Sequence, residues 1–461
     1  MGSLQLSDIQ AFIMHTYRPC ALRALVLKVQ NARATRAFLG TLISGDGSSP
    51  QLATADQWRE EHPYRVNVGI TYDGLAALGL PASSLSGFPD EFVGGSVAAA
   101  QRVGDTGESA PEHWQQPFTS RDVHLLVFLF ITDEANTEKI VEAVSARLRE
   151  RYMGTAACQE LCVRDARSLP GDVAHFGYRD GFAQPAIEGG PPPLLPDVLP
   201  QVPASEFLLG YENLTTDSVP APAELCKNGS YAAFRILEQD CRTFEEFLAE
   251  QSRRTNRDPE LIAAKLCGRW RSGAPLTLFP DADDPRRDDP ASFARYNSFD
   301  YVKTDSFQPT SDYDDSRGNL CPVGSHIRRM NPRHSRVAGN SGLSHRIVRR
   351  GLPYGPPYDA ANPNDGIERG LLGLFIGASL KNQFEFLMKH WANDGGFAGI
   401  GQTKDPILGD NSPAESTFLL PIQGSKKPVV LGGFPRFVTT RGGAYCFLPS
   451  VTAIRYLAGL P

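Results

Sequence analysis

The sequence lacks the features that would assign it to a membrane, secreted or nucleic-acid-binding class. It has no run of about 18 apolar residues, so no membrane-spanning helix is predicted. The first residues, MGSLQLSDIQAF, lack the basic and apolar regions of a secretory signal. We therefore expect a cytoplasmic protein, although a mature secreted form would look the same. The net charge of −6 gives no basic footprint, so nucleic acid is not an expected partner.

Cysteine is present but without a pattern. The eight cysteines include no Cys-x-x-Cys pair and no regular spacing, so neither a metal site of that kind nor a disulfide framework is predicted. We expect mostly free, buried thiols. The remaining composition, 41% hydrophobic and 21% charged, is typical of globular proteins, and a chain of 461 residues favours two domains.

Hydrophobic periodicity predicts alternating strands and helices in the first part of the chain. Residues 64–81 alternate at Val66, Val68 and Ile70 before taking helical spacing, which indicates a strand and then a short helix. Residues 122–132 are almost all apolar and lead into TEKIVEAVSARLRERY, whose spacing is helical. This order is typical of an α+β fold.

The second part shows a similar order. Residues 234–254 are predicted to form a charged amphipathic helix, and DPELIAAKLCGRW a helix that begins at Asp258 and Pro259. LLGLFIGA, at 371–378, predicts a buried strand, followed by the helix NQFEFLMKHWAND and a last strand near YCFLPS. The polar stretch at 281–301 is most simply a solvated surface loop. Two α+β halves of similar order suggest an internal duplication.

A proline-rich passage separates the two halves. Residues 189–206, GGPPPLLPDVLPQVPASE, cannot form a helix or a central strand, so they are predicted to form a rigid connector. The expected domains are therefore residues 1–188, ending just after a glycine-pinned loop, and residues 207–461.

Two short stretches carry candidate chemistry. HFGYRDGFAQP, at 175–185, places Asp180 in a Gly-x-x-Asp-Gly motif that is by itself common in turns. CPVGSHIRRMNPR, at 321–333, places His326 among arginines, and HRIVRRG adds Arg349. A lone histidine is usually structural, but a neutral imidazole can ligate haem iron and arginines can bind the haem propionates. The combination indicates a haem site.

These motifs in this order resemble a dye-decolorizing peroxidase of the larger fungal and bacterial branch. The similarity runs from DIQ at 8–10, through Gly177–Gly181, His326 and RRG at 349–351, to QFEFLMKHW at 383–391. It implies two ferredoxin-like α+β domains of the dimeric α+β barrel type, with one b-type haem held mainly by the C-terminal domain. It also implies reduction of hydrogen peroxide with oxidation of dyes, phenolics or other bulky aromatic donors.

The resemblance assigns roles to several residues. Asp180 would be the acid–base group, Gly181 would let the backbone approach the haem, and His326 would ligate the iron. Arg349 would stabilise developing negative charge, with its neighbour Arg350 as the main rival.

Further assignments leave alternatives open. Arg328 is expected at a propionate, against a surface salt bridge, and His175 at the propionate edge, against a structural role. Asp394 is the candidate carboxylate partner of His326, against a helix-end carboxylate without a role. The wall of the distal pocket is expected to include Leu374 and Ile376. Surface electron transfer is assigned to Tyr354 or Trp391, against ordinary packed aromatics.

Two other functions remain open at this stage. A deferrochelatase-like protein would release iron from haem on the same scaffold, and a haem-binding or storage protein would hold haem without turnover. The sequence does not determine the electron donor or the oligomeric state.

Overall fold

The computed structural model describes residues 4–44, 50–212, 220–304, 314–335, 343–421 and 427–460. Its centre is an eight-stranded antiparallel sheet in the order β4-β1-β3-β2-β10-β5-β7-β6. The first four strands come from the N-terminal half and the last four from the C-terminal half. One residue pair, Ile70 with Phe447, joins the two halves of the sheet.

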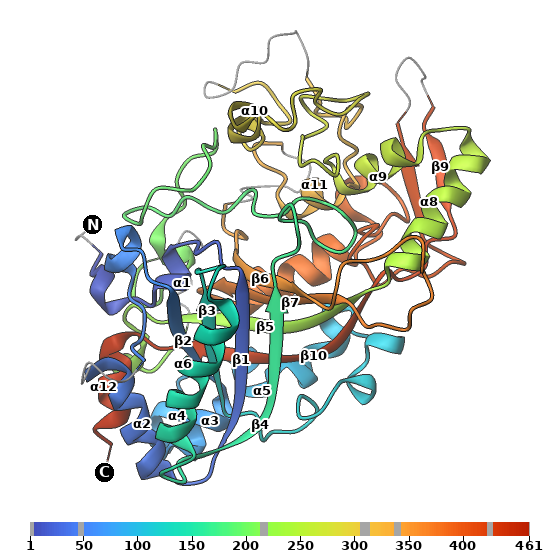
Figure 1. Cartoon of the computed structure of the whole chain (residues 1–461). Helices are drawn as coiled ribbons and strands as arrows, with labels where there is room; N and C mark the ends of the chain where they lie inside the picture. The colour runs from blue at the N-terminus through green and yellow to red at the C-terminus, as the bar shows by residue number, and fades with distance from the viewer. Residues whose placement is uncertain are drawn as a thin grey trace.

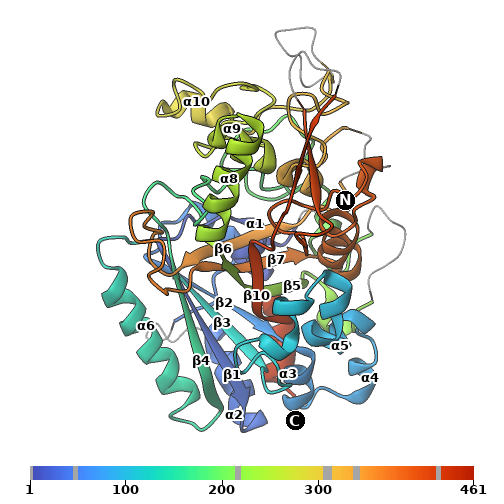
Figure 2. The ribbon, with the colours of Figure 1, turned by 90° about the vertical axis from the view of Figure 1, so that its right-hand side faces the viewer.

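The N-terminal half is one βαββαβ unit with strand order 4-1-3-2. It consists of β1 (Ala21–Val29), α2 (Ala32–Ser44), β2 (Tyr64–Ile70), β3 (Leu125–Ile131), α6 (Thr137–Tyr152) and β4 (Cys158–Arg167). β2, β3 and α6 confirm the elements predicted from the hydrophobic pattern, because apolar residues alternate in β2, fill β3 and recur at helical spacing in α6. Figure 2 shows α6 on the outside of this half.

The C-terminal half repeats the same strand order. It consists of β5 (Ser230–Gln239), α8 (Cys241–Thr255), β6 (Val348–Tyr354), β7 (Gly370–Gly377), π-helical turns at Leu380–Glu385 and Leu387–Ala392, and β10 (Val438–Leu448). The order β10-β5-β7-β6 is again 4-1-3-2. The duplication suggested by the sequence is therefore confirmed at the level of topology, and both halves are ferredoxin-like.

A core lies between the two halves, whose strands run in crossing directions in Figure 1. Alternate residues of β1, β3, β5 and β7 meet there, among them Leu22, Phe128, Phe234 and Leu374, all at most 1% exposed. Burying such side chains stabilises the folded chain by about 1.5–3 kcal/mol each. The opposite face of the C-terminal half of the sheet lines a cavity.

Two expectations from the sequence are wrong. Residues 234–239 belong to β5 rather than to a helix, because this segment pairs with both β7 and β10 and is almost wholly buried. The polar stretch 281–301 is not a solvated loop: it contains α10 (Pro290–Arg295) and buries Tyr296, Phe299 and Tyr301. In both segments, tertiary packing overrides the local polarity.

Further helices and two short strands complete the fold. They are α1 (Ala11–Met14), α3 (Tyr72–Ala77), α4 (Ala82–Leu85), α5 (Asp90–Ala99), α7 (Ala223–Cys226), α9 (Pro259–Cys267), α11 (His326–Met330), β8 (Thr417–Leu420), β9 (Val429–Gly432) and α12 (Val451–Ala458). α9 begins as predicted, with the Asp258 side chain accepting from the Glu260 N–H and Pro259 in the first turn.

The connector and the cysteines agree with the sequence analysis. Residues 189–206 contain a 3₁₀ turn at Ala204–Glu206 and no α-helix or strand, and they lie between the two repeats. The domain boundaries themselves remain a prediction. All eight cysteines are within the described residues and all are free, five of them buried. Across the described ranges, every helix is too short or too polar to cross a bilayer.

Candidate active site

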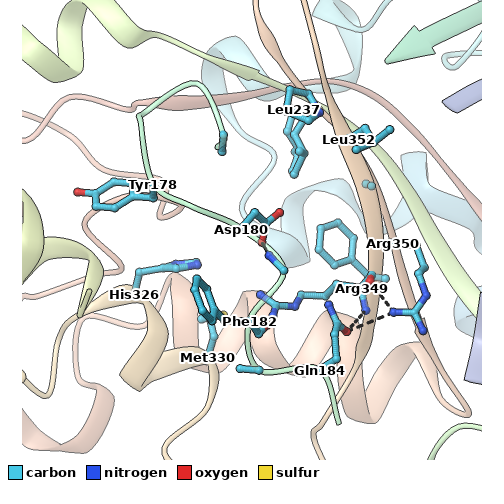
Figure 3. Close-up of a pocket in the computed structure, with 18 of the residues that line it drawn as sticks. Tyr178, Asp180, Phe182, Gln184, Leu237, His326, Met330, Arg349, Arg350 and Leu352 are labelled. Carbon is cyan, nitrogen blue, oxygen red and sulfur yellow. Dashed lines mark hydrogen bonds between the residues drawn. The ribbon is translucent and has the colours of Figure 1, made fainter. Parts of the chain in front are cut away.

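A cavity of about 910 Å³ lies against the C-terminal half of the sheet. One wall is the face of β5, β6 and β7 that points away from the central core, another is the segment 171–184, and α11 lies across from them. Asp180, His326 and Arg349 all line this cavity (Figure 3). The structure therefore brings together the three residues assigned to iron ligation and peroxide chemistry.

The register of β6 on β7 separates Arg349 from Arg350. Arg349 pairs with Phe375 and Arg350 with Leu374, so the two arginines lie on opposite faces of the sheet. Arg350 is buried, donates from Nε to the Phe12 carbonyl at 2.7 Å, and lies on the far side of the strand from Asp180 (Figure 3). Of the two rivals, Arg349 has its side chain on the cavity face.

The same register corrects part of the expected pocket wall. Leu374 borders the cavity as expected, although its side chain packs in the core between the two halves, whereas Ile376 lies in that core and does not line the cavity. The cavity side of β7 carries Phe375 instead, one residue away, because successive side chains of a strand point to opposite faces. Beside it, Gly351 faces Gly373 across the two strands, which leaves this part of the wall low and flat.

The loop that carries Asp180 is held in place through its backbone. Gly177 and Gly181 have φ of +83° and +89°, a region that favours glycine. The backbone N–H of Asp180 donates to the Asp172 carbonyl at 2.9 Å, and that of Arg179 donates to the Arg271 carbonyl at 2.9 Å. Asp180 itself stays exposed to the cavity. The two glycines of the motif thus allow a loop conformation that places the Asp180 carboxylate at the cavity.

Arg349 is linked to the same loop. Its Nη2 donates to the Phe182 carbonyl at 2.8 Å, and its backbone N–H donates to the Gln184 Oε1 at 3.2 Å. Gln184 also accepts from Arg350 Nη1 at 3.4 Å. Among the described residues, Arg349 and Asp180 form no direct ion pair. Asp180 and Arg349 therefore line the same cavity, and each is held there by its own hydrogen bonds.

His326 begins α11 and uses one ring nitrogen within the protein. Its Nδ1 lies 2.9 Å from Oδ2 of Asp405, a carboxylate that is 0% exposed. The Asp405 Oδ1 accepts from the backbone N–H of Ile407 and of Leu408, both at 2.9 Å. Burial by itself would raise the pKa of Asp405, but His326 and the Leu408 N–H hold it below its ordinary value. No described residue bonds the Nε2 of His326, which leaves this nitrogen for a ligand.

The structure therefore corrects the partner of His326. Asp394 accepts through Oδ1 from the Gly396 N–H at 2.8 Å, and its carbonyl accepts from Arg329 Nη2 at 2.7 Å. The Asp394 carboxylate therefore stabilises a local turn and does not contact the imidazole of His326. Asp405 carries no local signal in the sequence, because only the path of the chain brings it to His326.

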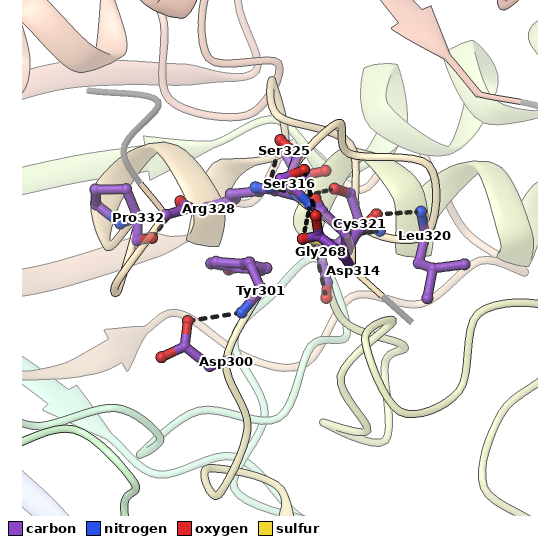
Figure 4. A network of polar contacts seen from close by, with 12 residues as sticks. Gly268, Asp300, Tyr301, Asp314, Ser316, Leu320, Cys321, Ser325, Arg328 and Pro332 are labelled. Carbon is purple, nitrogen blue, oxygen red and sulfur yellow. Dashed lines mark hydrogen bonds and ion pairs between the residues drawn. The ribbon is translucent and has the colours of Figure 1, made fainter. Parts of the chain in front are cut away.

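Arg328 is also corrected, because it is 0% exposed and does not line the cavity. Its Nη1 donates to Asp315 Oδ2 at 2.9 Å and to the Cys321 carbonyl at 2.6 Å, and its guanidinium stacks 4.3 Å from the Tyr301 ring centre (Figure 4). Both of its NH₂ groups are satisfied within the protein, so this arginine anchors the segment before α11 and holds no propionate.

Other arginines lie where an anion could be bound. Arg346 lines the cavity and is 6% exposed, but its guanidinium has only a 3.4 Å contact to the Ala183 carbonyl. Burial lowers the pKa of Arg346 to about 10; the carboxylate of Asp197 opposes this shift, and Arg333 and Arg349 add to it. Arg179 also lines the cavity, 4.0 Å over the Phe293 ring. Within the described part of the chain, no carboxylate forms an ion pair with Arg346 or Arg179.

The sequence analysis missed both of these arginines. Arg179 is next to Asp180, and Arg346 is three residues before Arg349. This closeness to an assigned residue was the only feature of the sequence that could have indicated them.

Three other assigned residues lie away from the cavity walls. His175 is buried, and its Nε2 contacts the Tyr354 carbonyl at 2.7 Å, which favours the structural alternative. Trp391 is 4% exposed and packs against Phe386 and Phe397, so it is not a surface residue. Tyr354 is half-buried and donates to Glu368 Oε1 at 2.9 Å, and its role in electron transfer stays a prediction.

Comparison with known proteins agrees with this arrangement. No protein-family model matches the chain. It is 30% identical to "Peroxidase 2" of Mycetinis scorodonius, over 98% of this chain and 87% of the relative. It is 31% identical to a dye-decolorizing peroxidase of Mycena epipterygia, over 85% and 76% respectively. A solved dye-decolorizing peroxidase in complex with 2,6-dimethoxyphenol superposes with a TM-score of 0.79 at 26% identity, covering 99% of this chain and 100% of that one.

Identity of this extent over nearly the whole chain, together with the shared fold, makes the chain a relative of these peroxidases in sequence as well as in structure. The chain belongs to the dye-decolorizing peroxidase family.

Proposed function

We propose that the cavity binds one b-type haem between α11 and the face of β5, β6 and β7, with His326 as the iron ligand. Three observations support the fit. The Nε2 of His326 is free of bonds to described residues, the wall opposite is low at Gly351 and Gly373, and Arg346 is a buried cation that forms no ion pair with any described carboxylate. An imidazole that binds the iron and cations that bind two propionates are what such a cofactor would require.

The propionates are assigned to Arg346 and Arg179. Both guanidinium groups line the cavity near Phe182 and have no carboxylate partner among the described residues. A buried guanidinium that forms no ion pair, as in Arg346, is destabilising unless an anion pairs with it. Two carboxylates of a bound cofactor would supply that charge.

On the opposite side of the cofactor, Asp180 and Arg349 are assigned to the cleavage of hydrogen peroxide. Bound haem supplies an iron centre that accepts the oxidising equivalents of peroxide. Asp180 would take the proton from one oxygen of peroxide and return it to the other, which would leave as water. Arg349 donates hydrogen bonds to the negative charge that develops on that oxygen. The separate anchoring of the two side chains leaves room for peroxide between them.

Asp405 is assigned to the other ring nitrogen of His326. A carboxylate that accepts from Nδ1–H fixes the tautomer, directs Nε2 at the metal and makes the imidazole a more basic ligand. Its Oδ1 accepts from two backbone N–H groups, which holds Oδ2 toward the imidazole, so the imidazole is fixed by a rigid acceptor.

The electron donors are assigned to the class of phenols and aromatic dyes. This rests on family membership and on the related enzyme that was solved with 2,6-dimethoxyphenol. The observation that carries the proposal is that His326, held by Asp405, lines the same cavity as Asp180 and Arg349. Haem storage would require no acid–base pair opposite the ligand.

The test is reconstitution with haem, followed by peroxide and a phenol or an anthraquinone dye. The proposal expects one haem per chain and donor oxidation that depends on peroxide. Stable haem binding without donor oxidation would favour storage instead. Loss of iron from intact porphyrin would favour the deferrochelatase-like alternative.

A further inference from the structure

A turn at residues 182–184 follows the Asp180 loop and is bonded to the start of β6 (Figure 3). β6 is the last strand of the sheet, so one of its edges has no neighbouring strand. At this edge the backbone N–H of Arg349 donates to Gln184 Oε1 at 3.2 Å, and the Arg349 carbonyl accepts from Arg350 Nη1 at 2.9 Å. Both backbone groups of Arg349 thus point away from β7, and the Gln184 side chain supplies the acceptor that a further strand would supply.

The same turn also holds the other end of Arg349. The guanidinium donates from Nη2 to the Phe182 carbonyl at 2.8 Å. The backbone and the side chain of one arginine are therefore bonded to residues only two positions apart, Phe182 and Gln184. Where Gln184 docks on β6 determines where the Phe182 carbonyl meets the guanidinium.

Ala183, between these two residues, adopts an unusual backbone conformation. Its φ is +56°, in the left-handed region that residues other than glycine seldom adopt. Such a conformation persists where surrounding contacts impose it. The two contacts with Arg349 flank Ala183 and contribute to holding it there.

We propose that Gln184 is a positioning residue, which docks the turn on β6 and thereby sets the spacing between Arg349 and Asp180. The inference rests on the roles of Asp180 and Arg349 in the proposed function. Asp180 is only four residues before Gln184, and in the described chain it makes no direct bond to Arg349, so the turn is the shortest connection between them. A misplacement of about 1 Å in a reacting constellation can lower a rate by about 10²-fold.

The experiment compares three variants of the haem-loaded enzyme in stopped-flow reaction with hydrogen peroxide at neutral pH. Gln184→Asn keeps the amide but shortens the side chain by one C–C bond, about 1.5 Å, so its oxygen no longer reaches the Arg349 N–H. Gln184→Glu keeps the length and the acceptor oxygen. Gln251→Asn is the matched control, because Gln251 is a buried glutamine outside the cavity wall that donates to the Gly432 carbonyl at 3.1 Å.

The rate constant should fall by about 10- to 10²-fold in Gln184→Asn and stay within a factor of a few of wild type in the other two variants. Fluoride binding to the ferric haem gives a readout without turnover, because a bound anion accepts hydrogen bonds from a nearby guanidinium. Optical titration should show weaker fluoride binding in Gln184→Asn and unchanged binding in Gln251→Asn. In the apo-protein, amide hydrogen exchange at Arg349 should be faster in Gln184→Asn than in wild type, which tests the contact even if that variant takes up no haem.

Several results would overturn the inference. These are wild-type reaction rate and fluoride affinity in Gln184→Asn, unchanged exchange of the Arg349 amide, or an equal loss of rate in Gln251→Asn or in Gln184→Glu. The wild-type enzyme separates this failure from that of the proposed function. Haem-loaded wild type that does not react with peroxide contradicts the roles of Asp180 and Arg349, whereas reactive wild type with an equally reactive Gln184→Asn contradicts the positioning role alone.

Discussion

Asp405 lies 79 residues after His326 in the chain, yet its Oδ2 is 2.9 Å from the Nδ1 of that histidine and is shielded from solvent. A carboxylate in this position makes the imidazole a stronger electron donor to a metal. Asp405→Asn should keep the residue's size but remove its charge, raise the reduction potential of the bound haem, and weaken binding or activity by about 10- to 100-fold. Spectroelectrochemical titration measures the potential. Asp394→Asn is the matched control, and an equal shift in that variant would contradict the assignment to Asp405.

Arg346 should contribute to haem affinity through its charge. Arg346→Leu removes a buried cation of the cavity wall, and a hydrogen bond to a charged group contributes about 1.5–3 kcal/mol. Titration of apo-protein with haem should show a loss of affinity of this size. Arg253→Leu, on the exposed face of α8, should bind haem as the wild type does. Wild-type affinity in Arg346→Leu would exclude this residue as a propionate partner.

Arg328 should contribute to stability rather than to cofactor binding. Its ion pair with Asp315 is wholly buried, so Arg328→Leu leaves a buried carboxylate unpaired and should cost about 3–5 kcal/mol of unfolding free energy. Urea denaturation of the apo-protein measures this cost. Arg242→Ala breaks the exposed pair with Glu246 and should cost about 0–1 kcal/mol. A small effect at Arg328 would show that the network of Figure 4 is dispensable.

His15 should make the fold less stable in acid. Burial, together with Arg65 and Arg350, lowers the pKa of His15 from 6.5 to about 4. The folded state thus binds this proton less readily than the unfolded state, so the contribution of His15 is complete above pH 6.5 and declines as the pH falls towards 4. His15→Gln should flatten the decline in unfolding free energy over that range, and the exposed His113→Gln should not. Parallel pH profiles for wild type and His15→Gln would contradict the expectation.

The sequence predicted those parts of the site that are encoded locally. Asp180 lies in a loop whose glycines provide the required backbone conformations within five residues, and His326 begins a helix beside several arginines. The strands β2, β3 and β7 and the helix α6 follow from periodicity, because one or both of their faces are buried.

The rest depends on how distant segments meet. The choice between Arg349 and Arg350, and between Phe375 and Ile376, is a matter of strand register, where a shift of one residue exchanges the two faces. Asp405 reaches His326 only through the tertiary path of the chain. Arg328 was misassigned because its charge suggested an anionic ligand, whereas the fold supplies Asp315 as its partner.

The central claim, that Asp180 and Arg349 cleave peroxide opposite His326, is tested most directly by stopped-flow measurement of the reaction of the haem-loaded enzyme with hydrogen peroxide. Asp180→Asn should lower the second-order rate constant by about 10²- to 10⁴-fold. Arg349→Leu should lower it by about 10²- to 10³-fold, the usual effect of removing one charge-stabilising donor. Arg350→Met, on the other face of β6, should react at nearly the wild-type rate if it retains haem. Rates within a factor of a few of wild type in the first two variants, or a large loss confined to Arg350→Met, would contradict the account.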